Sequence, residues 1–503
     1  MPDTRPPHAE ARSYWNATAE APQFPRLKGN VTVDVAIVGG GIVGATTARA
    51  LKDLGMTVAV LEARRVGRQV TGKSTAKVTS QHRLIYRTLK RKFGENGARL
   101  YAEAQEAGIG KIRELVARYG IDCELETKAA YVYTCDENYV RNIEEEVEIA
   151  RGFGLPAHFT RDTGLPFEVR GAMRFDGQAQ FHPTKYVAGL AKTIPGNGCH
   201  VFEGSRVIDW SPTELATDEG RIAAKQVVMA TNLPLGKIGG FYSEAHAHAE
   251  PVVVAPIGRV PDGMYISAEQ PSHSIRTRNQ DGQIYAIVAG PSFKPGDTKE
   301  ERRSFDEIER WLIGNFDAGS IAYRWVNEDY QSIDGAPFVG WSASRGDRYL
   351  VATGFGAWGL SNGTAAGMML ADLAAGQENR FIEVFDARRI KPVAGGAKFV
   401  AKNAGVAASL LGGHLRQKPK VFDALGRGEA AVLKIEGEKI AAFKDEHGRV
   451  HAVSATCTHM GCIVGWNEVD RTWDCPCHGS RFELNGDVLA GPAIKPLSPK
   501  SPA

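Results

Sequence analysis

Residues 31–62 read VTVDVAIVGGGIVGATTARALKDLGMTVAVLE, and this stretch decides the fold of the first domain. It opens with a β-branched run at 31–38 that breaks into glycines. A helix-like stretch follows at 42–54, and a second strand-like run follows at 57–61. This order of patterns predicts a βαβ unit at the start of an α/β domain.

The glycines of this unit have the spacing of a dinucleotide-binding turn. Gly39, Gly41 and Gly44 follow the first strand, and Glu62 ends the second. The first glycine makes the turn, the second lets the backbone approach a pyrophosphate, and the third allows helix–strand contact. Glu62 is placed to accept from a ribose hydroxyl, which argues against a 2′-phosphate. These features alone fit NAD and FAD equally.

The rest of the large domain alternates helical and strand-like patterns. Apolar residues recur at helical spacing at 95–120 and 137–153, whereas 199–232 and 251–292 are strand-rich. Residues 348–376 then return to a strand, a glycine turn and a helix. We therefore predict one α/β domain at 31–385, with a mainly antiparallel sheet on its substrate side and an N-terminal extension at 1–30.

Bulk composition excludes several classes of partner. The 503 residues include 61 basic and 58 acidic ones, a net charge of +3, so no global field recruits nucleic acid or anionic lipid. No apolar run of about 18 residues is present, which predicts no transmembrane segment. The first residues lack a secretory h-region and a twin-arginine pair, so we expect a cytoplasmic protein.

A change of composition marks a linker at 386–420, which is basic and rich in glycine and alanine. Its middle, 399–415, predicts a helix, which we interpret as a tether packed on the first domain. Peripheral contact of this helix with a membrane surface is the alternative. Residues 421–503 show short strand-like runs between turns, and they predict a small all-β domain.

Four of the seven cysteines fall within 21 residues of this last domain, which indicates a metal site. Cys457-x-His459 and Cys475-x-x-His478 each pair a thiolate with an imidazole, so two loops can hold one cofactor. Zinc also accepts two cysteines and two histidines. Zinc fingers, however, usually group two cysteines and then two histidines around a helix, so we favour another cofactor.

The segments CTHMGC and CPCHGS, at 457–462 and 475–480, resemble the Rieske family in its cytochrome bc-complex form. The resemblance implies a [2Fe-2S] cluster whose inner iron is held by Cys457 and Cys475 and whose outer iron is held by His459 and His478. It also implies a Cys462–Cys477 disulfide. A disulfide is unusual in a reducing cytoplasm, which leaves either an export route or a bridge shielded beside the cluster. Gly491-Pro492-Ala493 matches the family's proline loop over the cluster.

The redox potential of the cluster is expected to be intermediate. Histidine ligation raises the potential to about −150 to +300 mV in Rieske centres. Ser480 stands where high-potential members have a hydroxyl aimed at a sulfide, but Phe482 replaces their tyrosine. No D-x-x-H-x-x-x-x-H arrangement is present, and we expect His246 and His248 to lie on an exposed strand or loop. The cluster is therefore interpreted as an electron wire and not as the partner of an oxygenase iron.

The first domain resembles the D-amino-acid-oxidase-like flavoproteins (glycine and sarcosine oxidases) over about residues 30–385. The resemblance rests on residues 33–63, on TGKSTAKVTSQH at 71–82, and on the motifs SRVIDW, QVVMATN, IDGAPFVG and TGFGAWGLSNG. Two further segments, SYWNAT and QFHPTKYVAGLA, are similar to the γ-glutamylputrescine oxidase branch of the family. It implies FAD and places these residues at the cofactor: Gly39, Gly41, Ile42, Val43, Gly44, Glu62, Ala63, Arg64, Ser74, Thr75, Ala76, Lys77, Val207, Ala230, Thr231, Gly356, Gly359 and Leu360.

No catalytic base is assigned from the sequence. For His82 we expect a simple hydrogen-bonded histidine, with a covalent flavin bond as the alternative. For Arg276 we expect a structural or solvated charge, with a substrate carboxylate as its alternative partner. Lys73, Lys77 and His182 are left open in the same way.

The two resemblances together imply an FAD-dependent oxidoreductase that oxidises a C–N bond of an amine or amino acid. Electrons would pass from flavin through the cluster to an external one-electron acceptor or redox protein, with the histidine-bound iron near the surface as the exit. Two alternatives remain. An external reductant feeds the flavin through the cluster for a reductive or monooxygenase reaction, or the chain is an electron-transfer or redox-sensing subunit without turnover.

Overall fold

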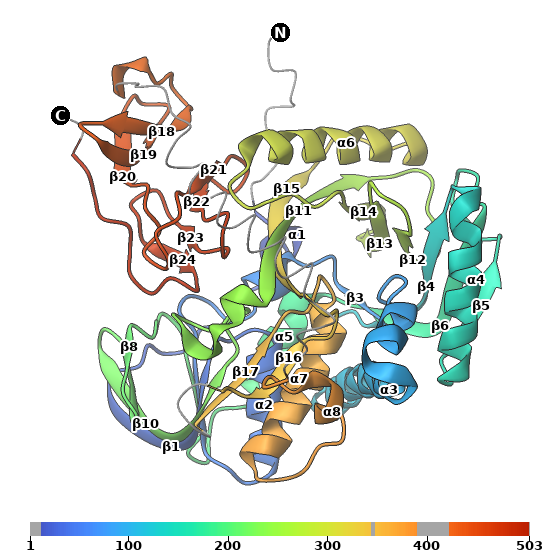
Figure 1. The fold of residues 1–503 in the computed structure, drawn as a ribbon, viewed down its shortest axis with the longest axis horizontal. Coiled ribbons are helices and arrows are strands. Elements are labelled where there is room, and N and C mark those ends of the chain that lie inside the picture. Colours follow the sequence, from blue (N-terminus) through green and yellow to red (C-terminus); the bar gives the residue numbers. More distant parts are fainter. Residues whose placement is uncertain (1–11, 344–347, 390–421, 502–503) are drawn as a thin grey trace.

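The computed structural model describes residues 12–343, 348–389 and 422–501. These residues form an α/β body, a second large sheet and a small C-terminal β domain that packs against both (Figure 1). The predicted linker helix at 399–415 lies outside the described residues. No helix of the described part is long and apolar enough to cross a membrane.

The α/β body is built on a parallel sheet that contains the quoted stretch. Its main strand order is β16-β17-β10-β1-β2-β7, with β16 antiparallel at one edge and the β8–β9 hairpin beside β10. The strands are β1 (Gly29–Val38), β2 (Val58–Leu61), β7 (His200–Phe202), β8 (Asp209–Trp210), β9 (Glu214–Ala216), β10 (Gly220–Met229), β16 (Phe338–Trp341) and β17 (Tyr349–Thr353). Val35 to Val38 are all buried, as expected for a central parallel strand.

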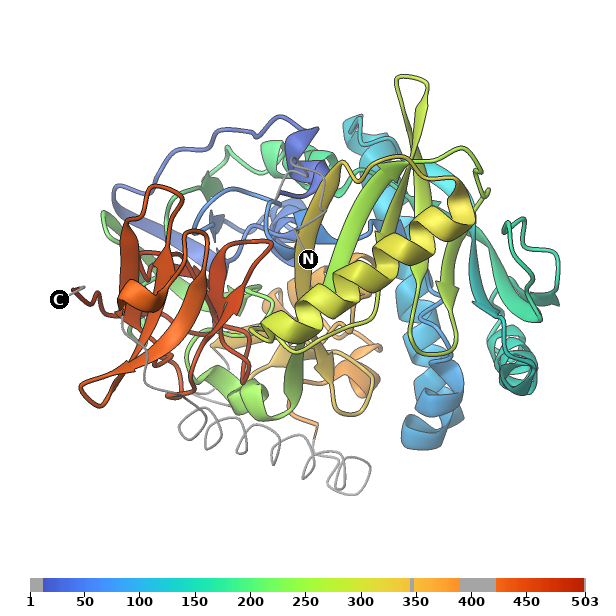
Figure 2. The same ribbon diagram turned by 90° about the horizontal axis from the view of Figure 1, so that it is seen from above.

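The second sheet corresponds to the region predicted to form the substrate side. Its pairings are antiparallel except for β4 with β12, which confirms the mainly antiparallel prediction. The strands are β3 (Lys77–Val78), β4 (Glu126–Thr134), β5 (Ala157–Thr160), β6 (Gly171–Gln180), β11 (Ala245–Pro256), β12 (Met264–Ser267), β13 (Ser274–Gln280), β14 (Gln283–Ala289) and β15 (Tyr323–Ser332). Viewed from above, α6 (Thr298–Phe316) lies across this sheet (Figure 2).

The other helices cover the α/β body or connect it to the second sheet. Helices α2 and α7 pack against each other beside the parallel sheet. The bounds are α1 (Tyr14–Ala17), α2 (Ile42–Asp53), α3 (Tyr86–Tyr119), α4 (Glu137–Gly152), α5 (Pro183–Lys192), α7 (Gly359–Ala374) and α8 (Ile382–Phe385), with 3-10 turns η1 (Val70–Lys73), η2 (Ile238–Ser243) and η3 (Phe422–Ala424). Within the predicted N-terminal extension, Tyr14 and Trp15 are fully buried, and Trp15 donates to the Ser74 carbonyl.

The C-terminal domain is all-β. Its two antiparallel sheets run β18-β19-β20 and β21-β22-β23-β24. The strands are β18 (Ala430–Ile435), β19 (Glu438–Lys444), β20 (Val450–Ser454), β21 (Gly465–Asn467), β22 (Thr472–Asp474), β23 (Arg481–Phe482) and β24 (Val488–Ala490). Trp473 and Phe482 are fully buried in its core together with Cys457 and Cys475.

Buried ion pairs hold this domain on the rest of the chain. Asp470 of the β21–β22 turn pairs with Lys73 of η1 and, at 2.8 Å, with Arg481. Arg481 also contacts Asp474 at 3.1 Å and approaches Glu328 of β15 at 3.8 Å. The backbones meet closely as well, since a Cβ on Gly465 would lie 2.0 Å from the Gly296 carbonyl oxygen. The C-terminal domain is therefore packed as one body with the described residues of 12–389, called the flavin-side domain because they carry the resemblance to flavoproteins.

The Lys73–Asp470 pair gives a stability prediction. Replacing Lys73 by Met leaves a buried carboxylate with one partner fewer, so we expect the free energy of unfolding to fall by about 3 kcal/mol. Arg302→Gln is the matched control, because it breaks the cross-domain Arg302–Glu468 pair, whose arginine side chain is 62% exposed. That change is expected to cost under about 1 kcal/mol. Urea unfolding of both variants measures these changes. Equal losses of unfolding free energy in the two variants would contradict a stabilising role of the buried Lys73–Asp470 pair.

Candidate functional site

The glycine turn after β1 brings two backbones into contact. Gly39 has φ +109°, and a Cβ there would lie 2.4 Å from the Ala230 carbonyl oxygen. A Cβ on Gly44 would lie 2.0 Å from the Gly39 carbonyl oxygen. Gly41 caps α2 in an extended conformation without a side-chain cap. The Ile42 amide donates to the Thr71 hydroxyl at 3.2 Å, and the next amides of the first turn remain available to an anionic ligand.

Glu62 closes the turn from the other side. Its carboxylate accepts from the Gly40 and Arg64 amides, each at 2.8 Å. Burial raises the pKa of Glu62, while the two amide hydrogen bonds oppose this shift. Each oxygen keeps a lone pair, so the carboxylate at the cavity wall can still accept from a hydroxyl.

A long cavity starts at this turn and reaches the N-terminus of α7. Twelve of the predicted cofactor residues line it: Gly39, Gly41, Ile42, Val43, Glu62, Ala63, Ser74, Val207, Ala230, Thr231, Gly359 and Leu360. The cavity joins a helix N-terminus, an acidic residue at a strand end and a second helix N-terminus. Such a donor set fits a dinucleotide with a pyrophosphate and a ribose.

The other six predicted cofactor residues do not line the long cavity. Thr75, Ala76, Lys77 and Gly356 line a second cavity, which shares Ser74, Gly359 and Leu360 with the first. Gly44 packs beneath the turn, and the Arg64 side chain pairs with Glu483 of the C-terminal domain. Arg65 and Arg206 border the long cavity.

The second cavity carries charge of both signs. Lys77 donates to the Tyr265 carbonyl at 2.7 Å, and Arg83 donates to the carbonyls of Ser267 and Ala268. Burial lowers the pKa of Lys77 to about 7 and raises that of Glu250 to about 7; Arg83 and Lys77 oppose the Glu250 shift. One acidic and two basic side chains therefore line the same space.

The expectation that His246 and His248 lie on an exposed strand or loop is wrong. Both lie on β11, where His246 is buried and His248 lines the second cavity. At these residues β11 pairs with β15, and His246 lies close enough to His478 to act on its charge, so the docked C-terminal domain helps to bury it. His248 faces Asp329 across the β11–β15 ladder.

The remaining open residues have structural contacts. His82 bonds to the Tyr101 hydroxyl at 2.6 Å through one nitrogen and to the Thr79 carbonyl at 2.8 Å through the other. Arg276 is buried and donates to the Ala76 and Phe181 carbonyls. His182 caps α5 by accepting from the Lys185 amide. Arg276 and His182 thus hold backbone in place, and His82 borders the second cavity.

The four predicted metal ligands converge in the C-terminal domain. Cys457 and Cys475 are buried free thiols close enough to hydrogen-bond, and Ser480 also bonds to the Cys457 sulfur. The rings of His459 and His478 meet edge to face with centroids 4.9 Å apart. The Nδ1 atoms of both rings are buried and have no hydrogen-bond partner among the described residues. Two thiols and two orphaned imidazole nitrogens fit a [2Fe-2S] cluster of the Rieske type.

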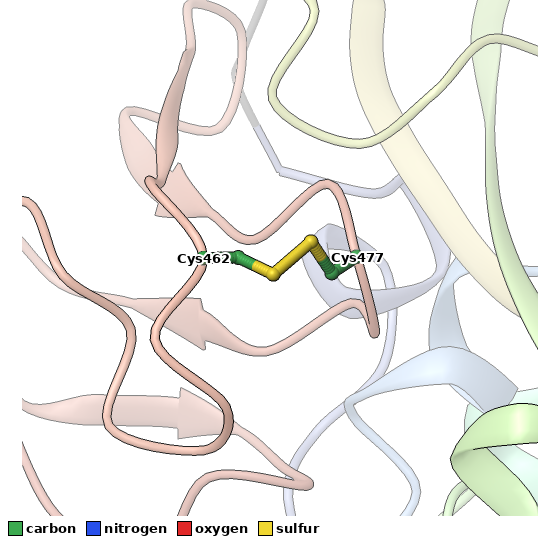
Figure 3. The surroundings of a disulfide bond; sticks show 2 residues. All are labelled: Cys462 and Cys477. Carbon is green, nitrogen blue, oxygen red and sulfur yellow. A yellow bond between two sulfur atoms is a disulfide. The ribbon is translucent and has the colours of Figure 1, made fainter. Parts of the chain in front are cut away.

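The two ligand loops are joined by a covalent bridge. Cys462 and Cys477 form a disulfide, as the resemblance implied (Figure 3). The sulfurs of Cys462, Cys477 and Cys475 lie within 4.8 Å of one another, but the bridge occupies the first two, so only Cys475 of this group has a thiol to offer a metal. The Ser480 hydroxyl accepts from the Ala493 amide at 3.0 Å, which ties in the proline loop.

The histidine edge of the site faces the flavin-side domain. His459 donates through Nε2 to the Gly236 carbonyl at 3.0 Å, and the Gly236 amide donates to the Pro492 carbonyl. Tyr242 packs edge-on against both rings, and the Tyr330 hydroxyl donates to the His478 carbonyl at 2.9 Å. His478 is only 6% exposed. The expectation of a histidine-bound iron at the surface therefore fails for His478, because the docked domain covers it.

Sequence reasoning missed the residues that this docking adds to the flavin cavity. The C-terminal domain contributes part of the wall: Gly479, Arg481, Leu489, Ala490, Gly491, Ala493 and Ile494. Asn327, Glu328, Asp329 and Tyr330 of β15 complete the wall. Nothing in the linear order of residues identifies them, since their role depends on how two distant segments meet.

Comparison with known proteins agrees with both sites. Residues 34–373 match the family of FAD dependent oxidoreductases (DAO), and residues 420–500 match the Rieske [2Fe-2S] domain. A protein of Bacillus subtilis, named as a Rieske 2Fe-2S iron-sulfur protein (YhfW), is 36% identical over 96% of both chains. The gamma-glutamylputrescine oxidoreductase of Escherichia coli is 26% identical over 73% of this chain and 90% of its own.

Solved structures agree on the fold of the larger part. Glycine oxidase from Geobacillus kaustophilus superposes with a TM-score of 0.60 at 19% identity, over 72% of this chain and all of that one. The family match, the long cavity at the glycine turn and the converging cysteines and histidines all point the same way. The chain belongs to the family of FAD-dependent oxidoreductases and carries a C-terminal Rieske [2Fe-2S] domain.

Proposed function

We propose that this oxidoreductase oxidises a C–N bond of an amino acid or amine and passes the electrons through its Rieske centre to an external one-electron acceptor. The observation that carries the proposal is the shared wall of the two sites. Gly479, the residue after His478, lines the same cavity as Gly39 and Gly359. A donor and an acceptor fixed this closely in one chain favour transfer between them.

The FAD would be held by the twelve predicted residues of the long cavity, and the cluster by Cys457, Cys475, His459 and His478. When bound, the flavin would accept a hydride and release electrons one at a time, and the cluster would carry single electrons. The protein contributes orientation. Tyr330 lines the flavin cavity and its hydroxyl donates to the His478 carbonyl. This hydrogen bond holds the cluster loop in a fixed position beside the cavity.

The charges of the second cavity support a zwitterionic substrate. Lys77 and Arg83 provide positive charge for a substrate carboxylate, while Glu250 provides the counter-charge for its amine. Lys77 and Arg83 are held by backbone carbonyls, so these two basic groups are in position before substrate binds. Shared lining at Ser74, Gly359 and Leu360 makes this cavity continuous with the flavin site.

The same cavity weighs against the alternative functions. A subunit that only relays electrons has no need of a second, charge-lined cavity beside its flavin. The reversed direction, from an external reductant to the flavin, uses the same docked domain and therefore differs only in what reduces the flavin. The identity of the reductant decides between the two directions.

The cytoplasmic location stays a prediction, and the position of the disulfide supports it. Cys462 and Cys477 are 1% and 4% exposed. Thiol exchange requires a thiolate to reach a bridge sulfur, so a buried bridge persists in a reducing compartment. Of the two explanations for a disulfide in a cytoplasmic protein, the burial favours a bridge shielded beside the cluster. An export route is then not needed to explain it.

Anaerobic mixing with a panel of amines and amino acids tests the direction. We expect flavin absorbance to bleach with one class of substrate, after which the cluster signal appears in electron paramagnetic resonance. Cys457→Ser is the control, since it should keep the first phase and lose the second. Bleaching that requires reduced ferredoxin, or NADH with a reductase, would instead establish the reversed direction.

The carboxylate of the second cavity gives a separate prediction. Glu250→Gln removes a charge-assisted contact to the amine, worth about 1.5–3 kcal/mol, so flavin reduction should slow by roughly ten- to hundredfold. Glu214→Gln, at an exposed pair with Arg221, is the matched control and should leave the rate unchanged. Stopped-flow absorbance measures both. An unaltered rate in the Glu250 variant removes this residue from the substrate site.

The cluster environment predicts a change of potential. Phe482 is fully buried in the core that holds Cys457 and Cys475, where it offers no hydrogen bond. Phe482→Tyr adds a donor near the cluster, and a net hydrogen bond of about 1 kcal/mol corresponds to roughly 40 mV for one electron, so the potential should rise by that order. Spectroscopic redox titration measures the rise. A potential equal to that of the wild type contradicts the interpretation of Phe482.

A further inference from the structure

The cluster reaches solvent at one corner. Of its four predicted ligands, Cys457, Cys475 and His478 are buried, whereas His459 is partly exposed. The next residue, Met460, is 40% exposed and is one of five exposed large apolar side chains among the described residues. The flavin-side domain covers the histidine edge from within, through Gly236 and Tyr242. Among the described residues, His459 and Met460 therefore offer an electron a solvent-exposed route from the cluster to an external carrier.

Two lysines from different parts of the chain flank this corner. Lys237 follows Gly236, the residue that accepts from His459, and its charge acts on the His459 ring. Lys495 lies beside Thr458, whose hydroxyl donates to the Lys495 carbonyl at 2.6 Å. Lys237, Thr458 and Lys495 are all exposed. The corner thus combines an exposed apolar residue, Met460, with exposed lysines on two neighbouring segments.

We infer that this corner, made of Lys237, Thr458, His459, Met460 and Lys495, is the docking surface for a small acidic one-electron carrier protein. The inference rests on the proposed function, because it concerns the carrier that takes the electrons. In the transfer, one electron moves from the reduced cluster to the oxidised carrier, and no bond forms or breaks. Lysines at the rim steer an acidic partner and set the encounter rate, while Met460 offers an apolar contact.

The flavin-side domain takes part in this surface. Lys237 belongs to the segment between β10 and η2, and Lys495 belongs to the C-terminal domain after the proline loop. A carrier that contacts both lysines therefore recognises the docked arrangement of the two domains. Small interfaces with charged rims are typical of transient electron-transfer complexes.

Succinylated and native cytochrome c provide a matched pair of probes, the first acidic and the second basic. We expect oxidised succinylated cytochrome c to bind the holoenzyme in a salt-sensitive manner, measured by calorimetry. Carbodiimide should cross-link its carboxylates to Lys237 and Lys495, identified by mass spectrometry. The Lys237→Glu/Lys495→Glu variant should bind it at least about tenfold more weakly and, once reduced with dithionite, should reduce it correspondingly more slowly.

The control variant is Lys28→Glu/Lys225→Glu, which reverses two charges that are 77% and 82% exposed on the flavin-side domain. It should bind and react as the wild type does. Equal binding of both cytochromes, cross-links at other lysines, or equal losses in the two variants would overturn the inference. Reduction by dithionite makes the result independent of the amine, so a failure here is distinct from a failure of the proposed oxidation.

Discussion

The buried ionic contact of Asp470 with Lys73 and Arg481 is the interaction on which the rest of the arrangement depends. Lys73 immediately precedes Ser74 at the flavin cavity, and Arg481 stands three residues after His478 in the C-terminal domain. Unpaired charges at this depth would be costly, so the contact favours one docked geometry. That geometry brings Gly479 to the flavin cavity and turns the histidine edge of the cluster toward Tyr242 and Gly236.

In the function that we propose, docking gives the molecule a substrate end and an electron end. The charged cavity with Lys77, Arg83 and Glu250 opens on one part of the flavin site, and the cluster loop closes another part. In this proposal, substrate and cluster approach the flavin from different walls of its cavity. The corner at Met460, which we infer to be the carrier site, is exposed at the surface of the molecule.

Local sequence determines much of this structure. The order of β1, the glycine turn and α2 follows from the period of residues 31–54 and from the close contacts of Gly39 and Gly44. The short motifs at 457–462 and 475–480 predicted the cluster ligands through their resemblance to the Rieske family, which also implied the Cys462–Cys477 bridge. The burial of His246, the turn of Arg64 toward Glu483 and the flavin-side role of Arg481 could not be predicted, because each depends on contacts between segments hundreds of residues apart.

A fixed position of the cluster on the flavin site is the central claim, and one spectroscopic measurement tests it most directly. In frozen holoenzyme reduced so that flavin and cluster each carry one unpaired electron, pulsed electron paramagnetic resonance reports their magnetic coupling. The docked geometry predicts one strong, narrowly distributed coupling in the wild type and a broader one in Lys73→Met. A weak or widely distributed coupling in the wild type would show a C-terminal domain that moves freely, and would contradict the claim.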